Sequence, residues 1–167
     1  MGLQRYQAKR HFDRTPEPRG AIASSRRATR PRFVVQKHAA STLHYDLRLE
    51  MDGVLKSWAV TKEPDADASV KRLAVRTEDH PLEYADFEGD IPEREYGAGH
   101  VDLWDQGVWI PQDAPLTSLR RGKLEFELKG RRMRGRWALI RMGNASTRKK
   151  HLWLLAKLAD GDGDARR

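Results

Sequence analysis

The sequence predicts an all-β fold, an antiparallel β-barrel of about seven or eight strands with an N-terminal arm and few short helices. Three observations lead to this class. Short apolar or alternating segments recur along the 167 residues, turn signals separate them, and no amphipathic helical pattern reaches about ten residues. Alternation with a period of two turns successive side chains to opposite faces of a strand, so one face of a sheet becomes apolar.

The clearest element is a hairpin. Residues 43–51 alternate between apolar and polar types, Asp52-Gly53 supplies a two-residue turn, and residues 54–60 form the return strand. An apolar run covers 33–35, and further strands are expected over 72–77, 100–104, 108–110, 122–128, 133–142 and 151–158. A turn at 105–107 separates two of these strands, and residues 82–89 are expected to include a helical turn. The tryptophans lie in strand-like segments, so we interpret most of them as core residues.

Composition divides the chain into three parts. Residues 1–31 form an arm that is only weakly periodic, and Pro16 and Pro18 keep part of it out of a helix. The stretch 23–30 is expected to be mobile. Residues 32–158 form the barrel domain, and residues 159–167, rich in Asp and Gly, are expected to be a flexible tail.

Charge is distributed unevenly along the chain. The formal net charge is +8, yet residues 39–119 hold 7 Lys/Arg against 17 Asp/Glu. Residues 1–38 hold 10 against 2, and residues 120–167 hold 15 against 5. Two basic ends around an acidic middle indicate a polyanionic partner, for which nucleic acid is the obvious candidate.

Composition also excludes several classes of protein. The absence of cysteine rules out disulfides, thiolate metal ligands and a cysteine nucleophile. No apolar run approaches the ~20 residues of a membrane span, and residues 1–10 lack the apolar core of a signal peptide. We therefore expect no membrane partner and a cytoplasmic, nucleoid-associated protein of bacterial type.

The polar face of the strand 43–51 carries an unusual row. His44, Asp46 and Arg48 alternate with apolar residues, about 6.5–7 Å apart. His44 and Asp46 can share one metal ion, and His38 supplies a third ligand once the short link 39–42 folds back. Two imidazoles and a carboxylate suit Mn²⁺, Fe²⁺ or Zn²⁺ better than Mg²⁺ or Ca²⁺. A solvated strand face with a His–Asp hydrogen bond is the simpler alternative.

Further residues fit phosphate chemistry. Arg48 lies beside the expected metal, while Arg72 and Arg76 share one face of the strand 72–77. His80 and Tyr84 follow at the end of that strand. Arginine and a metal together can neutralise the charge of a phosphoester transition state, and histidine can donate a hydrogen bond or a proton. The alternative for each of the two strand arginines is a surface charge paired with a nearby carboxylate.

These motifs resemble a known family. The segments Phe-Val-Val-Gln-Lys-His38, Leu-His44-Tyr-Asp46-Leu-Arg48-Leu-Glu, Lys-Ser-Trp58-Ala-Val-Thr-Lys62-Glu-Pro and Glu78-Asp-His80-Pro-Leu-Glu-Tyr84-Ala-Asp-Phe-Glu-Gly are similar to the 3′-phosphoesterase domain of bacterial DNA ligase D. That enzyme serves non-homologous end joining. The resemblance runs from about residue 6 to residue 158, nearly the whole chain.

The resemblance implies a Mn²⁺-dependent nuclease and phosphatase on a β-barrel. It would remove a 3′-terminal ribonucleoside from a DNA or DNA–RNA primer-template, and then hydrolyse the remaining 3′-phosphate to a 3′-hydroxyl. Ligase or polymerase modules and an end-binding protein of end joining are the implied partners. The implied site has the arm folded over it and consists of metal ligands His38, His44 and Asp46, catalytic residues Arg48, His80 and Tyr84, and substrate contacts Arg10, Glu17, Lys62 and Arg72. Arg76 joins the substrate contacts because it shares the strand face of Arg72.

The chain departs from the family pattern at one position. The family usually has Lys-Arg-Asp-Phe where this chain has Lys9-Arg10-His11-Phe12, so the diesterase step is the activity in doubt. The family's ligase and polymerase domains do not follow, which is expected of a stand-alone enzyme or an excised module. Two alternative functions remain: a non-haem Fe(II) oxygenase, which also uses a His-x-Asp and a second His, and a non-catalytic DNA-binding module.

Overall fold

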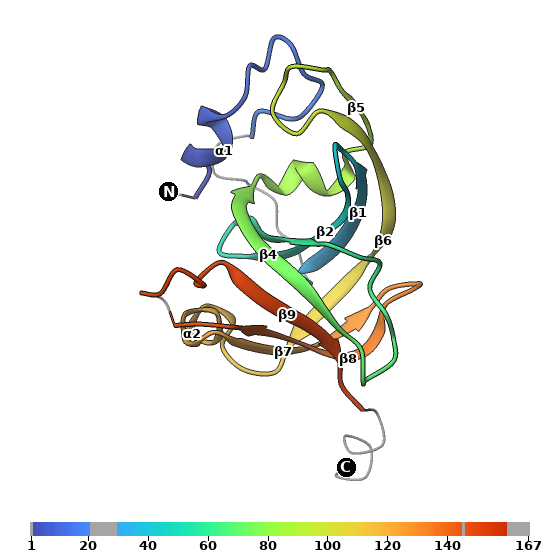
Figure 1. Cartoon of the computed structure of the whole chain (residues 1–167), viewed down its shortest axis with the longest axis vertical. Helices are drawn as coiled ribbons and strands as arrows, with labels where there is room; N and C mark the ends of the chain where they lie inside the picture. Colours follow the sequence, from blue (N-terminus) through green and yellow to red (C-terminus); the bar gives the residue numbers. More distant parts are fainter. Residues whose placement is uncertain (1, 21–29, 145, 160–167) are drawn as a thin grey trace.

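The computed structural model describes residues 2–20, 30–144 and 146–159, and it confirms the predicted fold class. The strands are β1 (Arg32–Ala39), β2 (Leu43–Met51), β3 (Val54–Val60), β4 (Lys71–His80), β5 (Gly89–Ile91), β6 (Gly99–Pro111), β7 (Lys123–Lys129), β8 (Arg134–Arg141) and β9 (Leu152–Lys157). They form one antiparallel sheet in the order β1-β2-β3-β4-β9-β8-β7-β6-β5. Because β1 also pairs with β6, eight strands close into a barrel, and β5 is an extra strand beside β6 (Figure 1).

Helices are few and short in the described residues, as expected. They are α1 (Gln4–Ala8), the 3₁₀ helix η1 (Leu82–Asp86) and α2 (Pro115–Arg121). Pro115 stands in the first turn of α2, and Gly122 ends that helix with φ 88°. No helix in the described ranges is both long and apolar enough to span a bilayer. The predicted mobile stretch, apart from Arg30, and the predicted tail, apart from Ala159, lie outside the described residues.

The hairpin of β2 and β3 has the predicted limits, and both turn residues, Asp52 and Gly53, have positive φ. The turn predicted at 105–107 is wrong, since β6 runs unbroken through it. The Asp105 carboxylate accepts backbone N–H hydrogen bonds from Arg131, Arg132 and Met133 at 2.7–3.1 Å. At Gly107 an added Cβ would lie 2.1 Å from the Lys129 carbonyl oxygen. These turn-like residues therefore anchor the turn of the β7–β8 hairpin.

Apolar side chains form two clusters. The larger one fills the barrel and contains Trp58, Trp109, Trp137 and Trp153, each at most 1% exposed, which confirms the core role predicted for most tryptophans. Each such side chain buries about 150–250 Å², roughly 4–6 kcal/mol of hydrophobic free energy before entropy is counted. The smaller cluster joins residues of the N-terminal arm and η1 to residues of β1, β3, β5 and β6, and includes Tyr6, Val34, Leu55 and Tyr84. The candidate site lies beside this outer cluster.

Candidate active site

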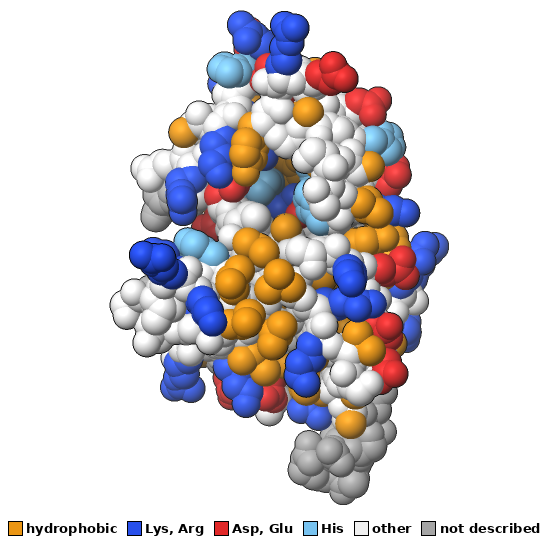
Figure 2. Space-filling model, in the orientation of Figure 1, with side chains coloured by type: hydrophobic (Ala, Val, Ile, Leu, Met, Phe, Trp, Pro, Cys, Tyr) orange, Lys and Arg blue, Asp and Glu red, His pale blue; other side chains and the backbone are white. Residues whose placement is uncertain are grey.

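Strand parity turns the predicted metal ligands to the outside of the barrel. The apolar residues of β2 fill the barrel interior, so His44, Asp46 and Arg48 face outward. The short link after β1 makes it the antiparallel neighbour of β2, with His38 opposite His44 and Gln36 opposite Asp46. Figure 2 shows histidine side chains in a recess in the upper half of this face of the molecule.

Backbone carbonyls fix the tautomers of both histidines. His38 Nε2 donates to the Gly97 carbonyl at 2.7 Å, and His44 Nδ1 donates to the Thr42 carbonyl at 3.0 Å. The opposite ring nitrogens then lie 3.5 and 3.2 Å from the two carboxylate oxygens of Asp46. All three side chains offer ligand atoms within 4.8 Å of one another.

The electrostatics of the cluster favour an anionic carboxylate. Burial raises the pKa of Asp46, but the Arg48 guanidinium and the contacts with the two histidine rings outweigh burial and hold that pKa far below its usual range. Burial lowers the pKa of His44, and its hydrogen bond and ion pair with Asp46 outweigh this and raise it. Neutral imidazoles would turn two lone pairs toward a carboxylate, which is unfavourable without a cation between them. The donor set therefore fits a borderline divalent metal ion.

Arg48 is held in place by Gln36, which the sequence reasoning missed. Arg48 Nε donates to Gln36 Oε1 at 2.7 Å, and Gln36 Nε2 donates to the carbonyl oxygens of Tyr84 and Phe87 at 2.7 and 3.1 Å. The guanidinium also lies over the Tyr84 ring, 4.8 Å from its centroid. Gln36 and His38 are two residues apart on β1 and therefore point to the same face of the strand. This spacing could have predicted that Gln36 lies in the site.

A register shift in β4 brings His80 to the same face. Thr77 pairs with Ser57 of β3 and His80 pairs with Leu55, so three steps on β4 match two on β3. This irregularity acts as a β-bulge and reverses the parity of the strand beyond it. Without the extra residue, His80 would point to the barrel interior, whereas it lies 4.7 Å from the Tyr84 ring, centroid to centroid.

His80 and Tyr84 are both buried and neutral. Burial lowers the pKa of His80 well below its usual value, and the charges of Arg48 and Arg10 lower it further. His80 Nδ1 donates to the Glu78 carbonyl at 2.9 Å, which leaves Nε2 as the acceptor. Burial raises the pKa of Tyr84 well above its usual value, and the Tyr84 hydroxyl donates to Glu17 Oε2 at 2.6 Å.

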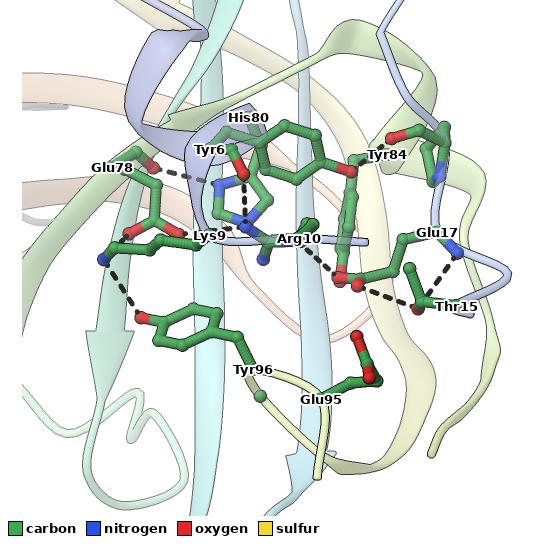
Figure 3. Close-up of polar contacts among 12 residues, drawn as sticks. Tyr6, Lys9, Arg10, Thr15, Glu17, Glu78, His80, Tyr84, Glu95 and Tyr96 are labelled. Carbon is green, nitrogen blue, oxygen red and sulfur yellow. Dashed lines mark hydrogen bonds and ion pairs between the residues drawn. The ribbon is translucent and has the colours of Figure 1, made fainter. Parts of the chain in front are cut away.

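The N-terminal arm contributes a buried guanidinium to this site (Figure 3). Arg10 Nε lies 3.0 Å from Glu17 Oε2, and one terminal nitrogen of Arg10 lies 3.4 Å from Glu78 Oε2. The Arg10 guanidinium stacks on Tyr6, whose hydroxyl donates to the Pro18 carbonyl. Glu78 is a residue that sequence reasoning did not place in the site, because the bulge hides its orientation.

These side chains surround a pocket of about 270 Å³. Of the predicted site residues, it is lined by Arg10, Glu17, His38, His44, Asp46, Arg48, His80 and Tyr84. Three others lie outside the pocket. Lys62 is exposed in the loop after β3, Arg72 Nε donates to the Glu63 carbonyl at 2.8 Å, and Arg76 lines a neighbouring cavity.

His11, the residue at which this chain differs from the family pattern, also lies outside this pocket. Its side chain is 65% exposed, and its Nδ1 lies 3.1 Å from Glu95 Oε1. Glu95 belongs to the segment between β5 and β6, so His11 ties the arm to that segment.

The fold and the site together define a class of protein: a closed antiparallel barrel with a two-histidine, one-carboxylate cluster among buried arginines. The family described as the DNA Ligase D 3′-phosphoesterase domain matches residues 36–141. This chain belongs to that family.

Three relatives show how far the similarity extends. The multifunctional non-homologous end joining protein LigD of Pseudomonas aeruginosa is 52% identical over 160 residues, which cover 96% of this chain and 19% of that protein. The Mycobacterium bovis protein of the same name is 49% identical, over 83% of this chain and 18% of the relative. LigD of Mycolicibacterium smegmatis is 40% identical, over 95% of this chain and 21% of that protein. This chain thus spans about a fifth of the length of the relatives it matches.

Proposed function

We propose that the chain is a Mn²⁺-dependent phosphoesterase that heals DNA 3′ ends. It removes a 3′-terminal ribonucleoside and then the remaining 3′-phosphate, leaving a 3′-hydroxyl. One observation carries this proposal: the free nitrogens of His38 and His44 converge on the Asp46 carboxylate, beside the buried guanidinium of Arg48. Membership of the phosphoesterase family supports a phosphoester as the bond that is cleaved.

The metal ligands in this proposal are His38, His44 and Asp46. A bound Mn²⁺ supplies a Lewis acid that neutralises the negative charge on a phosphate oxygen. The protein holds the ligands ready, because both imidazoles are already oriented by backbone carbonyls and the carboxylate is already anionic.

Arg48, His80, Tyr84 and Arg10 bind and orient the scissile phosphate. A guanidinium has five N–H donors, and Gln36 holds one of those of Arg48 while the group faces the pocket. Neutral His80 offers Nε2 as an acceptor, and the charge of an incoming phosphate raises its affinity for a proton. His80 in this role orients the phosphate or assists departure of the leaving group. The arm, whose Arg10 and Glu17 line the pocket, excludes water from the phosphate and strengthens these interactions.

The lining of the pocket favours phosphate over the organic substrate of an oxygenase. Arg10 and Arg48 both line the pocket, and both guanidinium groups are at most 4% exposed. Two desolvated guanidinium groups suit a doubly charged phosphate monoester better than a neutral substrate. The named function of the relatives, non-homologous end joining, supports DNA ends as the substrate, with ligase and polymerase modules and an end-binding protein as partners.

A 5′-labelled primer-template with one 3′-ribonucleotide tests this function. With Mn²⁺ we expect two products in succession, a primer shortened by one nucleoside that carries a 3′-phosphate, and the same primer with a 3′-hydroxyl. Their different charges separate them on a gel. An absence of both products with Mn²⁺, or equal activity in the presence of a chelator, contradicts the proposal. Turnover of an organic substrate with Fe²⁺, dioxygen and 2-oxoglutarate would favour the oxygenase instead.

A further inference from the structure

A second cavity adjoins the candidate active site and has no role in the proposed chemistry. Its volume is about 670 Å³, and three residues line both spaces: Thr77, Glu78 and Tyr96. Lys9 spans the shared wall, with its ammonium nitrogen 3.1 Å from Glu78 Oε1 and 3.3 Å from the Tyr96 hydroxyl (Figure 3). The two spaces therefore adjoin each other across these side chains.

The lining of the second cavity is strongly basic. Its cationic residues come from three separate parts of the chain and are Arg5, Lys9, Arg76, Arg141 and Lys150, with His151 beside them. The two acidic residues in the lining, Glu78 and Asp79, are already paired with Lys9 and with Lys56. Among the described residues, no carboxylate lies within ion-pair distance of Arg5, Arg141 or Lys150.

The geometry of the individual cations supports an electropositive cavity. Arg141 is fixed by backbone carbonyls, since its Nε donates to Gly143 at 2.8 Å and a terminal nitrogen donates to Arg120 at 3.2 Å. Burial lowers the pKa of His151, and the charges of Lys150, Arg5 and Arg76 lower it further. In Figure 2, Lys and Arg side chains lie along the left edge, where Figure 1 places α1 and the start of β9.

We propose that this basic cavity binds the phosphodiester backbone of the strand that is being processed, over the nucleotides that precede its 3′ end. This inference rests on the proposed function of the neighbouring pocket. Its backbone contacts are independent of sequence, because Lys and Arg neutralise phosphates without reading bases. The strand whose 3′ end occupies the catalytic pocket is the natural occupant, since Thr77, Glu78 and Tyr96 line both spaces.

Two exposed residues, Arg5 and Lys150, allow a test that leaves the fold intact. The test variant is Arg5→Glu with Lys150→Glu. The matched control is Lys129→Glu with Arg131→Glu, which makes the same change of charge on exposed residues at the opposite end of β8, outside both spaces. Activity is compared on single-stranded oligonucleotides of 12 and of 2 nucleotides, both with a 3′-phosphate.

For the test variant, we expect the ratio of kcat/KM for the long substrate to kcat/KM for the short substrate to fall about tenfold. The fall should come from a higher KM for the long substrate. The control should keep the ratio of the unmodified protein. An equal fall in the control or an unchanged ratio in the test variant overturns the proposal.

Equilibrium binding separates this inference from the proposed function. Anisotropy of a labelled single-stranded 12-mer, measured against salt, needs no catalysis. The slope of log affinity against log salt should become shallower by about 0.7 for each phosphate that the test variant no longer neutralises. If the slope changes but neither the unmodified protein nor any variant hydrolyses a substrate, strand binding in the cavity is supported and the proposed function is contradicted. If His44→Ala abolishes hydrolysis but neither slope nor ratio responds to the test variant, the cavity assignment fails alone.

Discussion

Arg10 and Glu17 form a buried ion pair, with 3.0 Å between Nε and Oε2 and side chains that are 4% and 0% exposed. Glu17 also accepts hydrogen bonds from the hydroxyls of Tyr84 and Thr15. The arm is thus joined to the barrel through groups that are shielded from water, and one carboxylate connects the arm to Tyr84 in the candidate pocket.

The first prediction concerns this pair. Glu17→Ala leaves the Arg10 charge buried with only its longer ion pair to Glu78, and removal of one partner of a buried pair costs about 3–5 kcal/mol. We expect that loss in the free energy of unfolding, measured by urea denaturation. The matched control is Asp86→Ala, which breaks the exposed pair with Arg32 and should cost less than about 1 kcal/mol. Similar losses in both variants would show that the arm is not held through Glu17.

A second prediction concerns pH. An unfolded histidine titrates near 6.5, whereas burial keeps the pKa of His80 well below that value in the folded protein. Between these two values the unfolded chain binds the additional proton, so stability is lost as pH falls below about 6.5. His80 contributes a slope of up to about 1.4 kcal/mol per pH unit in this window.

Urea denaturation in EDTA at pH 7 and pH 5 measures this contribution. His80→Gln keeps a donor for the Glu78 carbonyl and should show a smaller loss of stability between the two values. His100→Gln is the control with the opposite sign, because hydrogen bonds to Asp90 and Asp102 raise the pKa of His100. The stability that His100 contributes is present below about 6.5 and is lost as pH rises. Equal acid sensitivity in His80→Gln and the unmodified protein would contradict the buried neutral histidine.

The third prediction concerns His11. The resemblance predicts that His11→Asp raises diesterase relative to monoesterase activity. In the structure this aspartate would meet Glu95, now 3.1 Å from His11, and two carboxylates repel each other. We therefore expect a rise of a few-fold, on the order of one kcal/mol or less in the barrier, and a larger rise when Glu95→Gln is added. The two rates on a 3′-ribonucleotide primer measure this ratio. If it is unchanged in both variants, position 11 does not limit the diesterase step.

The local hairpin and the outward row on β2 could be predicted because sequence alone encodes them. A two-residue Asp-Gly turn sets the register, and an alternation of eight residues sets the face. The position of His38 beside His44 could be predicted as well. A link of only three residues between β1 and β2 makes the two strands antiparallel neighbours.

Other features depend on partners that are distant in sequence. Asp105 and Gly107 are typical of a turn, but they contact the turn of the β7–β8 hairpin and the end of β7, more than twenty residues further along. The parity reversal before His80 is a bulge against β3, and it hid the orientation of Glu78. The short β5 pairs only with β6 and carries no periodic signal. Gly97 acts through its carbonyl, a group that every residue has.

Titration of the metal-free protein with Mn²⁺, followed by electron paramagnetic resonance and by hydrolysis of a 3′-phosphorylated primer in the same samples, tests the central claim most directly. We expect one tightly bound ion per chain, with activity that rises in proportion to occupancy. His44→Ala and Asp46→Asn should lose both the bound ion and at least about 100-fold in rate, while His100→Ala keeps both. Retention of full Mn²⁺ binding and full turnover by His44→Ala would contradict the metal assignment and the chemistry built on it.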